Sequence, residues 1–292
     1  MSFCQASRMN LTFNINQRTH MPSSTRTTLT LGLAPAAMAT SLPAGANPRP
    51  LPYSYPYETL PAEEAELEQY VDLTPVRIVD PEDATGNGRL WDQQYRLQTE
   101  FEYGITDRLE LGLYLVLANE AGGPLAFDGI KQRLRLRLAD EGTLPVDIGL
   151  YGEIAEFHDE LEFEEKLILS KRFDKLRIMA NLWFEESLEH YEGELEATFH
   201  PTLGITQEIS PVLHLGVEYW GQTKFENEAA AGTVQHFNDG FHHYVGPAVS
   251  LQFGKLWWST GAYLRLDEMK RTTEVGDQFG HAWVRTVIAL SL

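Results

Sequence analysis

The chain is poor in cysteine, in long apolar runs and in basic residues. Its one cysteine, Cys4, leaves no pair for a disulfide within the 292 residues. No run of about 18 apolar residues follows the first fifty positions, so we expect no transmembrane helix there. Lys and Arg together number 23 against 42 Asp and Glu, a formal net charge of −19. This excess of acid argues against nucleic acid as a partner.

Residues 1–46 contain no Asp or Glu, although they carry three arginines, Arg8, Arg18 and Arg26. A mildly apolar stretch then runs from Leu29 to about Leu42 and ends in the small residues Ala44-Gly45-Ala46. This order of basic, apolar and small-residue regions predicts a secretory signal peptide over residues 1–46. The basic region has an ordinary length only when it is counted from Met21, which favours Met21 as the true start. A disordered tail rich in Ser and Thr is the alternative.

Residues 47–65 are rich in proline and tyrosine. Tyr53, Tyr55 and Tyr57 stand among five prolines, Pro48, Pro50, Pro52, Pro56 and Pro61. Because proline has no backbone N–H, this segment is expected to be extended and to form no strand ladder of its own. We expect a leader that lies in the periplasm or lines the mouth of a barrel, with a plain linker as the alternative.

One pattern continues from Glu66 to the last residue, in runs of ten or so residues that alternate apolar and polar side chains. Between Arg108 and Leu117, one face holds Leu109, Leu111, Leu113, Leu115 and Leu117. Alternation with a period of two indicates a strand with one apolar face. About twelve such strands predict an all-β fold, a single closed antiparallel up-and-down transmembrane β-barrel over residues 66–292, with lipid outside and a polar lumen.

The predicted strands are joined by connections that alternate in length. The strands are expected at 66–78, 90–104, 107–118, 128–139, 145–157, 160–170, 175–188, 192–206, 212–225, 241–253, 255–267 and 280–292. Short turns such as Ile105–Asp107 alternate with longer connections such as Glu226–Gly240. Short periplasmic turns and longer outer loops are typical of outer-membrane barrels, and an even strand number puts both termini on the periplasmic side.

A soluble β-sandwich or small soluble barrel is the rival architecture, because it also alternates apolar and polar residues. Strands of a soluble sandwich average five or six residues, however, whereas these run nearer about twelve. The polar faces also carry too many charges for a packed core. Both observations favour the cell outer membrane of a Gram-negative bacterium.

The hairpin from Glu102 to Leu113, Glu-Tyr-Gly-Ile-Thr-Asp-Arg-Leu-Glu-Leu-Gly-Leu, resembles one found in Gram-negative outer-membrane barrels of unassigned function. These include the proteins grouped as a phenol-degradation meta-pathway family, which are presumed to be transporters. The stretch Glu66–Leu73 is similar to the opening strand of such proteins. The resemblance implies a barrel that handles hydrophobic or aromatic compounds. The last residue, Leu292, departs from the aromatic residue that usually ends such barrels and is read by the barrel assembly machinery.

The polar face of the predicted strand 128–139 carries four cations, Lys131, Arg133, Arg135 and Arg137. Placing each of them in lipid at the midplane would cost roughly 2–4 kcal/mol, so we expect them to face the lumen. Pairing about a turn near Gly142 places Arg137 near Asp147 and Lys131 near Glu153. The predicted strand 160–170 adds further charges to the inner face, namely Glu162, Glu164 and Lys166.

These charges allow two functions. They could select a small solute that passes through a porin-like channel, with gating or selectivity at the nine residues just named. They could instead form a salt-bridged lattice that fills the lumen of a non-transporting envelope protein. Twelve strands give a lumen between the filled eight-stranded barrels and the open porins.

A lipid-acting outer-membrane enzyme is the third hypothesis. Such an enzyme needs a Ser nucleophile with a His base, and the phospholipase motif places His two residues before Ser and Asn-Gly after it. Ser250 and Ser259 have no His at that spacing, so we predict no enzyme.

We predict neither a cofactor nor a metal site. Five histidines are expected near the outer rim, His158, His190, His236, His242 and His243, but they lack the close spacing of strong zinc motifs. They are therefore taken as polar loop residues. Expected partners are outer-membrane lipid, the barrel assembly machinery and a small solute.

Overall fold

The computed structural model describes residues 48–79, 85, 88–119, 123–190, 195–228, 233–234, 241–267 and 280–292. The predicted signal peptide and His236 lie outside these residues. Within them, no helix is long and apolar enough to cross a membrane.

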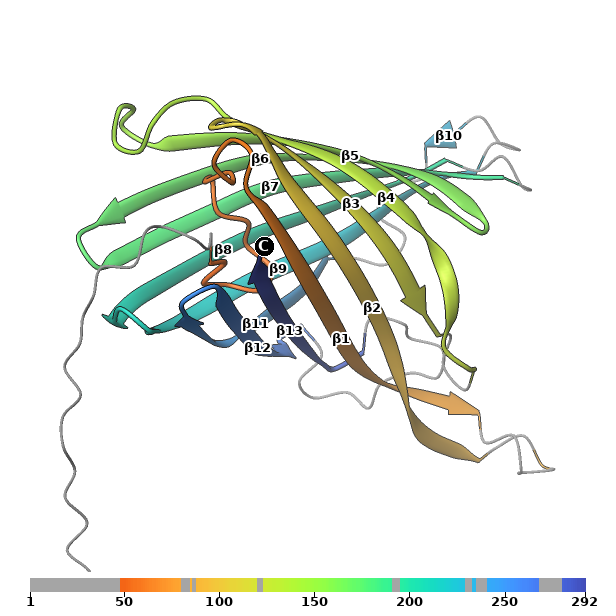
Figure 1. The fold of residues 1–292 in the computed structure, drawn as a ribbon. Coiled ribbons are helices and arrows are strands. Elements are labelled where there is room, and N and C mark those ends of the chain that lie inside the picture. The colour runs from red at the N-terminus through yellow and green to blue at the C-terminus, as the bar shows by residue number, and fades with distance from the viewer. Residues whose placement is uncertain are drawn as a thin grey trace, which may run out of the picture. The chain divides into compact units, whose positions relative to one another are not determined.

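The described chain is built of antiparallel strands, each paired with the next (Figure 1). Pairing of β8 with β9 and of β13 with β1 closes the sheet on itself. The barrel strands are β1 (Ala65–Val79), β2 (Arg89–Thr106), β3 (Leu109–Ala118), β4 (Ala126–Arg137), β5 (Asp147–Phe157), β6 (Glu160–Phe173), β7 (Leu176–Glu189), β8 (Leu195–Ser210), β9 (Leu213–Glu228), β11 (Phe241–Phe253), β12 (Leu256–Arg265) and β13 (Ala282–Ser291). The predicted twelve-stranded antiparallel barrel is confirmed. The thirteenth strand, β10 (Thr233–Val234), pairs only with the end of β9.

The two faces of the barrel wall differ as the alternation predicts. On β4, Leu134 is 49% exposed on the outer face, whereas Arg133 beside it is 1% exposed and points inward. The same alternation of buried and exposed positions runs through β5. A soluble barrel would bury its leucines and expose its arginines, so this polarity identifies a wall that faces lipid.

One end of the barrel carries the tighter connections. Two-residue turns join β2 to β3, β6 to β7, β8 to β9 and β11 to β12, and β1 begins and β13 finishes at this same end. We call it the periplasmic end, since outer-membrane barrels have their short turns there. Two connections break the alternation in length. Residues 138–146 join β4 to β5 at the periplasmic end, and only residues 158–159 join β5 to β6 at the outer end.

The predicted register of β4 against β5 is wrong by two residues. Arg137 pairs with Gly149 rather than lying near Asp147, and Lys131 pairs with Ala155. The prediction centred the hairpin on Gly142. The observed connection, residues 138–146, is wider, and the two strands are not paired symmetrically about Gly142. Gly142 adopts a left-handed φ of 74°, and its N–H donates to the Asp147 carboxylate at 2.7 Å.

Trp257 and Trp258 follow the β11–β12 turn and lie on opposite faces of the barrel wall. Trp257 is fully buried and points into the barrel, where its indole N–H donates to Glu66 at 2.8 Å. Trp258 lies on the outer face, with its indole N–H on the Thr286 hydroxyl at 2.6 Å. Neighbouring strand residues face opposite sides, so only one of two adjacent tryptophans can lie at the interface.

The proline- and tyrosine-rich segment lies inside the barrel. Residues 48–64, which we call the leader, form no strand and are drawn in orange beside the start of β1 (Figure 1). Their side chains are largely buried, including Arg49, Leu51, Tyr53, Tyr55 and Tyr57. The leader therefore reaches deeper than the periplasm or the barrel mouth, the two places that the sequence favoured.

Candidate solute site in the lumen

An ionic lattice centred on Arg133 lies in the periplasmic half of the lumen. The Arg133 guanidinium donates to Glu100 at 2.6 Å, to Glu110 at 2.6 Å and to Glu102. Its Nε also donates to the Tyr114 hydroxyl at 2.9 Å. The side chains of Arg133, Glu100 and Glu110 are 0% exposed. Such a completely desolvated cluster holds its geometry because losing one partner would leave uncompensated buried charge.

A glycine makes room for this lattice. Gly112 on β3 pairs directly with Arg133 on β4. A Cβ atom at position 112 would lie 2.6 Å from the Arg133 Nε and 2.8 Å from its Cγ. The guanidinium therefore lies across the space that a side chain at position 112 would fill.

Cations of the barrel wall stack on the leader tyrosines. The Arg285 guanidinium lies over the Tyr53 ring at 3.9 Å, and the Lys166 ammonium lies 4.1 Å from the centre of the Tyr55 ring. Lys166 is also within 4.0 Å of Tyr151 and 3.8 Å of Trp183, so aromatic rings surround it. Cation–π contacts between desolvated groups are among the stronger ones of their kind.

Backbone groups of the leader are satisfied by wall side chains. The N–H groups of Tyr53 and Ser54 donate to the Glu218 carboxylate at 3.2 and 2.5 Å. Asn181 accepts from the Tyr55 N–H at 2.7 Å and donates to the Tyr55 carbonyl at 3.2 Å. These bonds replace the ladder that the prolines prevent, and they fix the leader at residues far away in the sequence.

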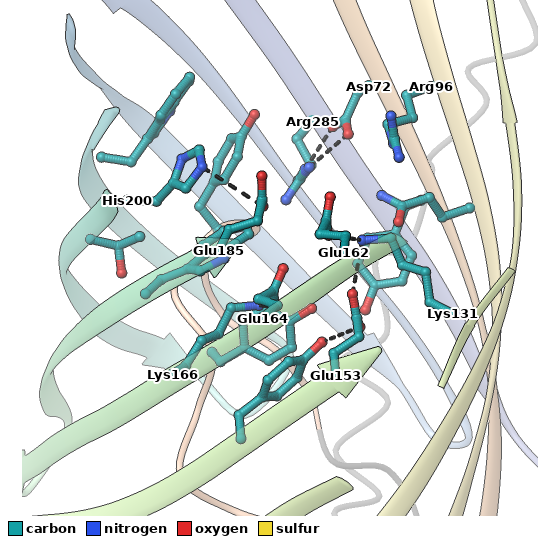
Figure 2. Close-up of a pocket in the computed structure, with 18 of the residues that line it drawn as sticks. Asp72, Arg96, Lys131, Glu153, Glu162, Glu164, Lys166, Glu185, His200 and Arg285 are labelled. Carbon is teal, nitrogen blue, oxygen red and sulfur yellow. Dashed lines mark hydrogen bonds and ion pairs between the residues drawn. The ribbon is translucent and has the colours of Figure 1, made fainter. Parts of the chain in front are cut away.

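A cavity of ≈ 280 Å³ occupies the lumen on the outer side of the leader (Figure 2). Tyr53 and Tyr55 form part of its lining. Six carboxylates and four cations contribute to the rest, namely Asp72, Glu153, Glu160, Glu162, Glu164 and Glu185 with Arg96, Lys131, Lys166 and Arg285. This volume is just below that of ligand pockets, which span about 300–1,000 Å³.

Ion pairs orient most of these charges. Lys131 Nζ lies 2.8 Å from Glu153 and 3.5 Å from Glu162, and Lys166 pairs with Glu164. Arg285 holds Asp72 through two bonds of 2.6 and 2.7 Å, as Figure 2 shows. Glu185 lies 3.8 Å from His200 and opposite Glu164 on β6, and the described residues place no lysine or arginine within ion-pair distance of it. The lining therefore has six carboxylates against four cations, and Glu185 is among the carboxylates that exceed the cations.

Several polar atoms of the cavity wall have no partner within the described part of the chain. These are the indole N–H groups of Trp183 and Trp220 and the hydroxyl of Tyr53. Trp220 and Tyr53 stack on each other with ring centres 4.6 Å apart. A buried donor without an acceptor is costly, so a solute oxygen at this wall would gain more than one at a satisfied wall.

The nine predicted lumen residues divide between the two halves. The structure brings five of them together around the cavity, Lys131, Glu153, Glu162, Glu164 and Lys166. Although the register is shifted by two residues, Lys131 lies near Glu153 as predicted, because its long side chain reaches the Glu153 carboxylate. Arg133 and Arg135 lie in the buried lattice. Arg137 and Asp147 do not line the cavity. They lie at the periplasmic end, where Arg137 donates to the Asp107 carbonyl at 2.9 Å.

Sequence reasoning missed several residues of the cavity, among them Asp72, Trp183, Glu185, His200 and Arg285. Glu185 and Trp183 have a signal that could have found them, because they occupy alternate inward positions of β7. The two aromatic residues that the leader contributes, Tyr53 and Tyr55, had no such signal.

Two carboxylate clusters in the barrel have metal-like spacing, Glu66 with Glu68 and Glu102, and Glu153 with Glu162 and Glu164. The second already holds the ammonium groups of Lys131 and Lys166. In the first, Glu68 pairs with Arg49 at 3.7 Å. These lysine and arginine groups supply the positive charge that the carboxylates require.

Of the outer histidines, His242 and His243 lie at the outer end of β11. His242 lies 3.0 Å from the Asp267 carboxylate, and the His243 N–H donates to Asp267 at 3.0 Å. Burial raises the pKa of Asp267, but these bonds and one from Arg265 outweigh it and lower the pKa to about 2. His158 lies on a different connection, beside Asp159.

Comparisons with known proteins agree with this architecture. No protein-family model matches the chain, and no curated protein matches its sequence. Among solved structures, an outer membrane channel from Pseudomonas putida F1 is similar, with 11% sequence identity, 81% of this chain and 98% of that chain covered, and a TM-score of 0.55. The chain has the fold of an outer-membrane β-barrel.

A second solved structure, the NanC porin, covers 77% of this chain and 98% of its own, at 6% identity and a TM-score of 0.49. At these identities the likeness concerns the fold. Membership of the phenol-degradation family stays a prediction, and so does the solute.

Proposed function

We propose that this outer-membrane barrel is a porin-like channel that admits a small hydrophilic solute to the cavity in the outer half of its lumen. The observation that carries the proposal is the cavity itself, a space of ≈ 280 Å³ lined by charges and aromatic rings inside a closed barrel. Aromatic faces and a few oriented polar groups are the usual lining of sites for small molecules.

The lining also supports a preference for charge. Six carboxylates face four cations around the cavity, and Glu185 has no close cationic partner in the described chain. Rings of acidic side chains favour cations in channels. We therefore propose that selectivity lies with Lys131, Glu153, Glu162, Glu164, Lys166 and Glu185, and that Arg133 and Arg135 hold the wall together.

Planar-bilayer conductance of the purified barrel in a salt gradient tests this function. We expect discrete conductance steps and a reversal potential that favours cations. Glu185→Gln is expected to weaken that preference. Glu156→Gln is the matched control, because Glu156 is exposed on the outer face near the end of β5 and contributes nothing to the cavity lining.

The salt-bridged, non-transporting envelope protein is the second candidate. The observation that favours it is the obstructed lumen, where Arg133 and its three carboxylates are desolvated and the leader lies buried beside them. Absence of conductance from the full chain and from a variant without the leader would leave this candidate ahead of the channel.

A further inference from the structure

We propose that residues 48–61 form a plug that closes the periplasmic half of the lumen and leaves it when solute passes. The inference rests on the proposed channel function and names its regulation. It is argued from the position of the leader between two cavities, the way the wall holds it, and the chain that joins it to β1.

The plug separates two spaces in the lumen. Tyr53 and Tyr55 line the outer cavity, whereas Pro48 and Pro50 line a second cavity of ≈ 370 Å³. This second cavity is also bordered by Lys175 and by Pro211, which lie in the short turns of the periplasmic end. The two cavities share no lining residue. A solute that enters the outer cavity therefore meets the plug before it reaches the periplasmic one.

The wall has a shaped seat for the plug. Leu51 is fully buried against Gly204 on β8 and Gly216 on β9. A Cβ atom at Gly204 would overlap the Leu51 side chain, and one at Gly216 would lie 2.8 Å from Leu51 Cδ2. Two glycines on the inner face of neighbouring strands thus create a niche that the leucine occupies. The plug is a fitted part of the barrel.

The bonds that hold the plug can be exchanged for water. Glu218 is fully buried and has no cationic partner among the described residues. Its partners are the Tyr53 and Ser54 N–H groups and the Tyr263 hydroxyl. When the plug leaves, the carboxylate and the freed N–H groups regain hydration, which offsets much of the loss of these bonds. A ladder within a sheet could not be exchanged so readily.

The barrel does not depend on the plug for closure. The β8–β9 and β1–β13 ladders complete the ring through strand pairing alone. The chain between plug and β1 also has a natural point of movement. Glu63 adopts a left-handed φ of 67°, which is costly for a residue with a side chain, and its N–H donates to the Gly104 carbonyl at 2.8 Å. Relaxation of Glu63 lets residues 48–61 swing while β1 stays paired.

A reversible disulfide tests the plug. The Ser54 and Thr202 hydroxyl oxygens are 2.9 Å apart, so the sulfur atoms of cysteines at these two positions would lie close to each other. The variant is Ser54→Cys/Thr202→Cys with Cys4→Ser, and each single-cysteine variant is its control. Heat-shifted mobility on gels reports that every barrel is folded.

We expect low conductance from the oxidised pair and a several-fold rise when a reductant is added, with no response from the controls. Two further variants work without a disulfide. Deletion of residues 48–61 and Gly204→Leu, which fills the Leu51 niche, should both raise conductance. Gly152→Leu is the matched glycine control, because Gly152 is exposed and a Cβ there meets nothing within 4 Å.

Two results would overturn the plug in distinguishable ways. Equal conductance of the oxidised pair, the reduced pair and the unaltered chain would show that solute passes beside a fixed leader, and the channel function would stand. No conductance from the unaltered chain, the reduced pair or the folded deletion variant would overturn the channel and the plug together.

Discussion

Lys131 and Arg133 stand two residues apart on the same face of β4, yet they belong to regions of opposite character. Arg133 lies in the periplasmic half, where three carboxylates surround it and its side chain is 0% exposed. Lys131 lies in the outer half, where its partners Glu153 and Glu162 line a cavity. The comparison teaches that inward-facing charge alone does not indicate a pore. A pore is indicated only where the inward-facing charges border a cavity, and not where they contact only one another.

The largest expected effect comes from breaking the ionic lattice in the periplasmic half. Arg133→Met leaves Glu100, Glu102 and Glu110 buried without their common cation, and losing one partner of a buried pair costs about 3–5 kcal/mol. We expect a loss of that size in the free energy of unfolding, measured by urea titration in detergent. Lys131→Met is the matched change in the outer half and should cost less, because its partners Glu153 and Glu162 border a cavity and the partners of Arg133 do not. Equal losses would contradict the division into two halves.

A second effect concerns the boundary between the halves. Glu218→Gln replaces a charged acceptor of the leader N–H groups by a neutral one. Hydrogen bonds to charged groups contribute about 1.5–3 kcal/mol and neutral ones about 1 kcal/mol. The free energy that keeps the leader bound to the wall should therefore fall by about 1–2 kcal/mol. Protease cleavage within residues 48–61 of the folded barrel should become faster. An unchanged cleavage rate, like that expected for Glu156→Gln, would mean that Glu218 does not hold the leader.

A third effect concerns the aromatic contacts. Tyr55→Leu removes the ring that Arg49 and Lys166 approach at 3.9 and 4.1 Å. Because desolvated cation–π contacts contribute up to about 2 kcal/mol, we expect a loss of about 1–2 kcal/mol in the unfolding of the full barrel. Tyr55→Phe keeps the ring and should retain most of the stability. Equal losses in both variants would assign the effect to the hydroxyl group instead.

The smallest effect lies at the outer rim, beyond both halves. The pKa of Asp267 is lowered from its ordinary value of 3.8 to about 2. The ionised carboxylate therefore stabilises the fold fully at pH values above 3.8, and this contribution is lost as the pH falls toward 2. Asp267→Asn should therefore cost about 1 kcal/mol at pH 5, after allowance for partial exposure, and almost nothing at pH 2. Thermal unfolding at the two pH values measures the difference. A pH-independent difference would rule out the charge as its cause.

The sequence predicted the barrel well because its alternation is local. Each run such as Leu109–Leu117 contains its own evidence for a strand and for the face that meets lipid, and the barrel follows from counting the runs. The register of β4 with β5 failed because it depends on residues 138–146, whose turn is set by a bond from Gly142 to Asp147 that has no sequence pattern.

The candidate site was predicted only in part, for a related reason. The cations of β4 lie on an alternating strand, so their inward direction could be read directly. The role of the leader could not, because the partners of Tyr53 and Tyr55 are 165 and 126 residues away in the chain. A segment rich in proline contains no periodic signal that could point to such distant contacts.

Gly112 bears on how the barrel could assemble without error. The cations at 131, 133, 135 and 137 repeat every second residue, so a slip of β4 by two positions would exchange one cation for another and cost little in charge. Steric fit is less forgiving, because only the position opposite Gly112 has room for a guanidinium to lie across the neighbouring strand. The missing side chain at position 112 thereby fixes the register of a strand whose charges alone would allow several. A bulkier residue at position 112 should therefore yield barrels that are trapped with mispaired strands during insertion.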